Sequence, residues 1–111
     1  MSSRLTAILV FGLALANSAH AHDPRCDRSI DLVQPRNGIV SNAQTASAVA
    51  LAYLVPVYGR ATISHQLPLR ATLHDEMWTV EGVHPPGWIG GNALIMLCQR
   101  NGMVLRMIHT K

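Results

Sequence analysis

Small proteins without a large cofactor catalyse reactions through histidines, cysteines and carboxylates that meet as pairs or clusters. The chain has six histidines, and none has the His-x-x-x-His or clustered Cys/His spacing of a zinc site. Glu81 is the only acid well inside an expected strand, and the glycine and valine after it offer no partner. A deep pocket lined by a polar pair such as Glu81 and His74 would favour an enzyme. Without such a motif, we expect no catalytic site, no metal and no cofactor.

The cysteines, Cys26 and Cys98, form a single pair, and neither is flanked by a motif typical of a catalytic thiol. An oxidising compartment favours a disulfide between them, whereas two free thiols are the alternative. The bridge would close a loop of about 70 residues and tie the amino-terminal arm to a strand near the other end of the chain. We expect the disulfide.

The compartment follows from the first 21 residues. A short segment with the positive charge of Arg4 precedes an apolar run of 12 residues, 5–16. Ala19-His20-Ala21 then has small residues at the two positions that a signal peptidase recognises. A membrane anchor would need about 20 apolar residues. We therefore expect a signal peptide at 1–21, a mature protein that begins at His22 without a membrane span, and a periplasmic or secreted location. A copper site at the new amino terminus is an alternative with no second motif behind it.

The mature chain would have 90 residues, enough for one small domain and too few for two. Its basic residues are scattered singly, which disfavours a nucleic-acid binder. The segment 22–38 is polar and turn-rich, and we interpret it as an arm ordered by Cys26. Residues 39–111 would form the domain.

The clearest helix signal starts at Ser41 and Asn42, both good N-cap residues. The alanine-rich run that follows predicts a helix to Val55, kinked or ended by Pro56. Both faces are nearly equally apolar, so we expect the helix to be mostly covered. Residues at helical spacing form the expected packing face, namely Ala46, Val49, Ala50, Tyr53 and Leu54. We expect 60–66 to be a connector.

Four strands are expected after the connector. Alternating residues at 67–74 predict an edge strand, followed by strands at 77–83, 92–99 and 103–109. Asn101-Gly102 is a strong hairpin signal, and a two-residue turn there would place Cys98 opposite Leu105 and Met96 opposite Met107. Both faces of this hairpin are apolar, so the pattern leaves open which face meets the helix. The expected fold class is α+β, with one helix packed on a curved four-stranded antiparallel meander.

Several short motifs stand in a fixed order over 37–111. After the capped helix come Pro56-Val57-Tyr58-Gly59, Leu67-Pro68-Leu69, Trp78-Thr79-Val80-Glu81-Gly82, Gly90-Gly91, Asn101-Gly102 and His109-Thr110-Lys111. In this order and spacing the chain resembles the nuclear transport factor two-like fold immunity proteins of bacterial polymorphic toxin systems. The resemblance implies a reduced, cystatin-like fold in which one helix lies in a bent antiparallel sheet. The motif residues with expected structural roles are Tyr58, Gly59, Trp78, Gly82, Gly90, Gly91 and Gly102.

The resemblance also implies a protein that binds and neutralises a toxin without catalysis. An immunity protein that protects against a cytoplasmic toxin would not be expected to have a signal peptide. The toxin would therefore act outside the cytoplasm, or the domain would serve another role in the envelope. Trp88, in the Pro/Gly-rich loop 84–91, either anchors an interface or folds back over the open end of the core. The alternative function is an envelope enzyme or small-ligand-binding protein that uses the concave sheet face. The sequence does not determine the oligomeric state. The candidate partner-binding residues are Trp88, His84, His109 and Lys111.

Overall fold

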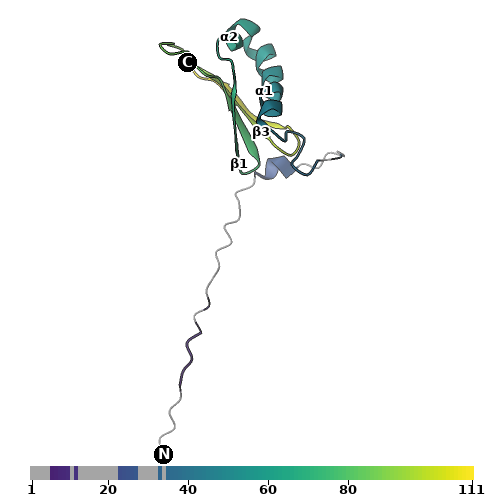
Figure 1. Cartoon of the computed structure of the whole chain (residues 1–111), viewed down its shortest axis with the longest axis vertical. Coiled ribbons are helices and arrows are strands. Elements are labelled where there is room, and N and C mark those ends of the chain that lie inside the picture. The colour runs from purple at the N-terminus through teal and green to yellow at the C-terminus, as the bar shows by residue number, and fades with distance from the viewer. Residues whose placement is uncertain (1–5, 11, 13–22, 28–32, 34) are drawn as a thin grey trace, which may run out of the picture.

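The computed structural model describes residues 6–10, 12, 23–27, 33 and 35–111. Within them, a long helix α1 (Ala43–Tyr58) and a short helix α2 (Arg60–Ser64) precede four strands. The strands β1 (Arg70–His74), β2 (Met77–Glu81), β3 (Ala93–Cys98) and β4 (Val104–His109) form one antiparallel sheet in the order β1-β2-β3-β4. Figure 1 shows α1 lying across one face of this sheet. The expected fold class, a helix on a four-stranded antiparallel meander, is confirmed.

Helix α1 begins where the sequence places a cap and continues past its proline. The Asn42 side chain accepts a hydrogen bond from the Thr45 amide at 2.8 Å, which satisfies one of the free donors of the first turn. Pro56 lies inside the last turn, and the helix ends only at Gly59, where φ is 91°. Glycine adopts this conformation without a Cβ clash, and its amide donates to the Val55 carbonyl.

The expected connector at 60–66 is a helix over most of its length. Residues Arg60–Ser64 form α2, in which the Ile63 amide donates to the Gly59 carbonyl. A helix this short is unstable alone, because nucleation costs more than so few hydrogen bonds return. The Ile63 side chain is fully buried in the core. Burial of this residue therefore stabilises a helix that the sequence pattern does not predict.

Helix α1 is less covered than we expected. Ala46, Ala50 and Leu54 are fully buried against the sheet. The inclusion of Tyr53 in the packing face is wrong, because this side chain is 47% exposed. The opposite side of the helix lies in solvent, because the sheet covers only one of its faces.

The sheet face that meets the helix alternates along β2 and β3. Val80 pairs with Ile95, and Trp78 pairs with Leu97, so these four side chains share one face. All four are buried, and the indole Nε1 of Trp78 donates to the Val40 carbonyl at 2.7 Å. Trp78 therefore lies in the core between α1 and the sheet.

The β3–β4 hairpin has a different register from the one we expected. Met96 pairs with Arg106 rather than Met107, and the register shifts between Met96 and Leu97. Cys98 lies before the turn, where its amide donates to the Met103 carbonyl, so the pairing with Leu105 is also wrong. The cause is a connection longer than two residues, in which the Asn101 side chain accepts from the Met103 amide at 2.9 Å.

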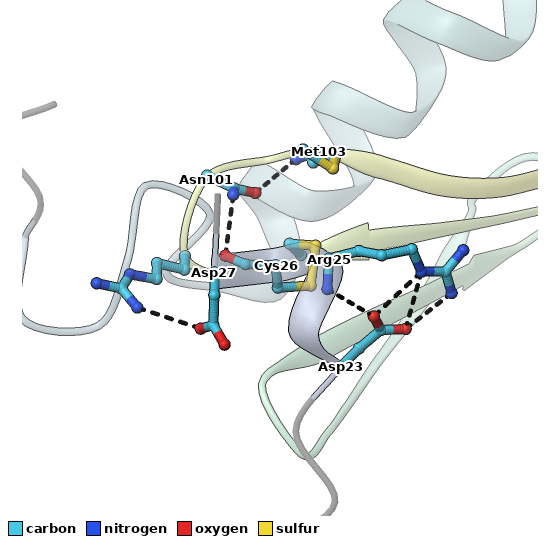
Figure 2. Close-up of a disulfide and its surroundings, with 8 residues drawn as sticks. Asp23, Arg25, Cys26, Asp27, Asn101 and Met103 are labelled. Atoms are coloured by element: carbon cyan, nitrogen blue, oxygen red, sulfur yellow. Dashed lines mark hydrogen bonds and ion pairs between the residues drawn. A yellow bond between two sulfur atoms is a disulfide. The ribbon is translucent and has the colours of Figure 1, made fainter. Parts of the chain in front are cut away.

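A disulfide fastens the arm to this hairpin. Cys26, in the short 3₁₀ helix η1 (Pro24–Asp27), is bonded to Cys98 at the end of β3, so the expected bridge is present. Figure 2 shows the Asn101 side chain reaching from the hairpin turn to the Cys26 carbonyl, a hydrogen bond of 3.1 Å. Arg100 contacts Asp27 at 3.5 Å on the exposed side of the same turn. The arm is therefore attached covalently and by polar contacts at one end of the sheet.

None of the described helices combines the length and the apolar character that a membrane crossing requires. The expected signal peptide and its cleavage site fall largely on residues outside the described ones, as does His22.

Candidate functional site

The site begins with Gln66, a buried polar residue two positions after the end of α2. Its side chain is almost fully buried, and its Oε1 accepts a hydrogen bond from the Ala93 amide at 2.7 Å. Its Nε2 lies 3.3 Å from the Thr62 carbonyl and 3.0 Å from Nε2 of His109. Gln66 therefore links α2, the start of β3 and the end of β4 at one end of the sheet.

These contacts determine the tautomer of His109. The Ala93 amide can only donate, so Gln66 presents Oε1 to it and its NH₂ group to His109. Nε2 of His109 then accepts, and Nδ1 carries the proton that is donated to the Thr110 carbonyl at 2.7 Å. The Tyr58 ring packs 5.3 Å from the His109 ring, centroid to centroid. Both ring nitrogens of His109 are thus engaged in the fold.

The loop 84–91 forms the outer wall of the site. The Trp88 amide donates to the Pro85 carbonyl, and the Trp88 ring stacks on His65 with centroids 5.5 Å apart and an interplanar angle of 21°. Gly90 lies under the indole, where a Cβ would come within 2.6 Å of Nε1. Trp88 remains 48% exposed and the next residue, Ile89, is 98% exposed. The indole therefore covers an imidazole at the surface and does not join the buried core.

The base of the loop is fixed to Thr110, the residue directly after β4. The Asn92 amide donates to the Thr110 hydroxyl at 2.9 Å, and that hydroxyl in turn donates to the Asn92 side-chain oxygen. Gly91 lies so close to Thr110 that a Cβ would overlap the Thr110 carbonyl. The two backbones approach closely here, and a side chain at residue 91 would push the two segments apart.

A pocket of about 360 Å³ opens between α2, the loop and β4. We call it the Trp88 pocket. Figure 1 shows α2 and the C terminus at the same end of the molecule, and the lining residues come from the segments at this end. Its lining is mostly apolar and includes no acidic residue; the lining residues are Ala61, Thr62, His65, Gln66, Trp88, Gly90, Gly91 and His109.

Only two of the four candidate partner-binding residues line this pocket, namely Trp88 and His109. Lys111 is exposed two residues after His109. His84 is half-buried, and its Nδ1 is enclosed without a hydrogen-bond partner among the described residues. Sequence reasoning missed Gln66, because nothing in the local pattern distinguishes a buried glutamine from one in a polar connector.

The polar pair that would favour an enzyme does not form. Glu81 pairs with Arg70 at one end of the β1–β2 ladder, whereas His74 pairs with Met77 at the other end. The His74 side chain is 88% exposed and contacts Asp75 at 3.2 Å. Within the part of the chain that the structure describes, no three metal-binding side chains gather into a group.

A second pocket of similar volume lies at the opposite end of the sheet, beside the arm. It is polar and carries both signs of charge, with Arg36, Glu76 and Arg100 in its walls. Arg100 already contacts Asp27 there. Of these two pockets, only the Trp88 pocket lies beside large exposed apolar side chains, namely those of Trp88 and Ile89.

Comparison with known proteins supports the resemblance seen in the motifs. The sequence model of a family described as NTF2 fold immunity protein matches residues 45–111, which include all four strands and most of α1. Neither the curated proteins nor the solved structures contain a match to the chain. By its matched sequence and its helix-on-meander architecture, the chain belongs to the NTF2 fold immunity protein family.

Proposed function

We propose that the chain is an exported immunity protein that neutralises a cognate toxin by protein–protein contact, without chemistry of its own. The family membership supports a toxin as the partner. We infer binding by protein–protein contact from two large apolar side chains that are exposed at the tip of loop 84–91. Trp88 and Ile89 are 48% and 98% exposed beside the Trp88 pocket.

Such a tip fits an interface for two physical reasons. Tryptophan is among the residues that contribute most to binding when a partner covers them, because it removes a large apolar area from water. The loop is also anchored, since Asn92 and Thr110 are joined by hydrogen bonds at its base. An anchored loop loses little conformational entropy when it binds.

Two of the polar side chains around the pocket, His109 and Gln66, serve the fold and are not available for catalysis. General base catalysis needs a ring nitrogen that is available to take a proton from a substrate. Both nitrogens of His109 contact other parts of the protein, and the amide of Gln66 is used in the same network. These side chains hold the pocket in shape.

An envelope location is supported by the sequence of the first 21 residues and by the disulfide between Cys26 and Cys98. A toxin that is neutralised there would act on the cell wall or at the membrane. We propose 22–38 as the arm and 39–111 as the binding domain of the mature protein.

The test is a binding measurement with the toxin encoded beside the gene of this chain. Trp88→Ala should weaken binding by about thirtyfold or more, the size typical of an interface tryptophan, and should reduce protection of cells that produce the toxin. Tyr53→Ala is the matched control, because it truncates an aromatic side chain of the same exposure, 47%, on α1. Both variants should unfold at the wild-type denaturant concentration. Unchanged affinity for Trp88→Ala would remove the loop from the interface.

A further inference from the structure

The Trp88 pocket contains polar groups that the fold does not use. Within the described part of the chain, no hydrogen bond engages Nε1 of Trp88, the hydroxyl of Thr62 or the imidazole of His65. All three residues line the same pocket, and the indole edge that bears Nε1 lies over Gly90, a fourth lining residue. An indole N–H can only donate, and a hydroxyl and a neutral imidazole each have one hydrogen to donate. The pocket is therefore equipped to bind a group rich in acceptors.

The wall of the pocket carries no negative charge. No acidic residue lines it, and Arg60 directly precedes the lining residue Ala61 in the sequence. Asp75 and Glu76, in the β1–β2 turn, lie at the other end of the sheet, and Glu81, at the end of β2, is not among the lining residues. An anionic group would therefore meet no acidic side chain in the pocket wall.

The apolar lining of the pocket indicates which kind of anion would fit. The walls are mostly apolar and include the stacked rings of Trp88 and His65 and the backbone of Gly90 and Gly91. An acidic side chain fits both features, because its methylene groups pack on apolar walls while its oxygens reach the donors. The exposed Ile89 next to the pocket supplies a surface for an apolar neighbour of that acid.

Resting on the proposed function, we propose that the Trp88 pocket receives a glutamate or aspartate side chain of the toxin, presented next to an apolar residue. The carboxylate accepts hydrogen bonds from Nε1 of Trp88, the hydroxyl of Thr62 and the imidazole of His65. Hydrogen bonds to a charged acceptor are stronger than neutral ones, and partial exclusion of water by the apolar walls strengthens them further.

The first experiment uses two capped peptides, acetyl-Gly-Leu-Glu-Leu-Gly-amide and its glutamine counterpart, with the oxidised protein. The indole N–H resonance of Trp88 is followed by NMR, and that of Trp78, which is buried and bonded to Val40, is the internal reference. The glutamate peptide should shift the Trp88 resonance downfield and bind at least about tenfold more tightly, the size expected for hydrogen bonds to a charged group. Equal binding of both peptides, or no shift at about 10 mM, ten times a millimolar Kd, would overturn the proposal.

Propionate alone tests whether the pocket is a site for free carboxylates. It should bind much more weakly than the glutamate peptide, because it makes no contact with Ile89 or the rim. Equal affinity would indicate a small-ligand site and would contradict a protein segment as the occupant.

Two variants remove donors and keep the shape of the pocket. Thr62→Val is close to isosteric, and His65→Phe preserves an aromatic ring against Trp88. Each should reduce the affinity of the glutamate peptide by about tenfold and leave that of the glutamine peptide unchanged. The same variants should weaken the toxin complex by a similar factor.

The toxin measurement separates this inference from the proposed function. Toxin binding that depends on Trp88 but not on Thr62 or His65, together with equal binding of the two peptides by the protein, would refute the carboxylate site. It would leave the immunity function intact. A clear preference for the glutamate peptide without any binding of the toxin would refute the proposed function and leave the chemistry of the pocket intact.

Discussion

Gln66 offers the sharpest test of how the site is held together. Its Oε1 is the acceptor for the Ala93 amide, and Ala93 is fully buried. In Gln66→Leu, water cannot replace that acceptor, so the amide loses its hydrogen bond entirely. A buried donor left without a partner costs about 1–3 kcal/mol of stability.

The other two contacts of Gln66 contribute less. Thr62 is exposed and His109 is only half-buried, so water can hydrogen-bond to the Thr62 carbonyl and to the His109 ring after the substitution. Leucine has a volume similar to that of glutamine and recovers some stability through apolar burial. We expect a net loss of about 2 kcal/mol, which lowers Tm by roughly 8–16 °C in a domain of this size.

The free energy of unfolding is measured by urea denaturation with the disulfide intact, and amide exchange of Ala93 is followed by NMR. Gln44→Leu is the matched control, since the same change at an exposed position on α1 should stay within about 0.5 kcal/mol of wild type. His109→Phe, which removes one of the three Gln66 contacts and the hydrogen bond to the exposed Thr110 carbonyl, should cost under about 1 kcal/mol because water can replace both. A Gln66→Leu protein as stable as wild type, with slow exchange at Ala93, would refute this account.

Four further predictions concern the arm, the leader and the loop. Mass spectrometry of the mature protein should give a mass lighter by two hydrogen atoms than the dithiol, and free thiols in envelope material would contradict the bridge. Cys26→Ser should lower the free energy of unfolding by up to about 4 kcal/mol, because the bond closes a loop with a sequence separation of 72. Deletion of 1–21 should retain the protein in the cytoplasm, as judged by fractionation; equal export without these residues would disprove the signal peptide. Gly91→Ala should destabilise the domain by about 1–3 kcal/mol, because its Cβ would overlap the Thr110 carbonyl, and an unchanged unfolding midpoint would show that the backbone yields there.

The sequence patterns that succeeded are local ones. Asn42 caps α1 as its side chain predicts, and the alternation in β2 places Trp78 and Val80 on the buried side. The two-residue turn at Asn101-Gly102 failed because the hairpin connection is longer, with Asn101 bonded to Met103 and to Cys26. The turn is bonded to the arm through Asn101 and Cys26, and a local turn rule does not include contacts with residues far away in the sequence.

The sequence by itself determined the helix, the four strands and their antiparallel order, because capping and side-chain periodicity act between near neighbours. Only the tertiary structure decided which apolar face of β3 packs on α1, since both faces satisfy the same alternation. It also decided the site. Ile63 is buried and stabilises α2, α2 places Gln66 against Ala93 and His109, and that network shapes the pocket beneath Trp88. A hydrogen bond between residues far apart in the sequence follows from how the elements pack, and no local pattern encodes it.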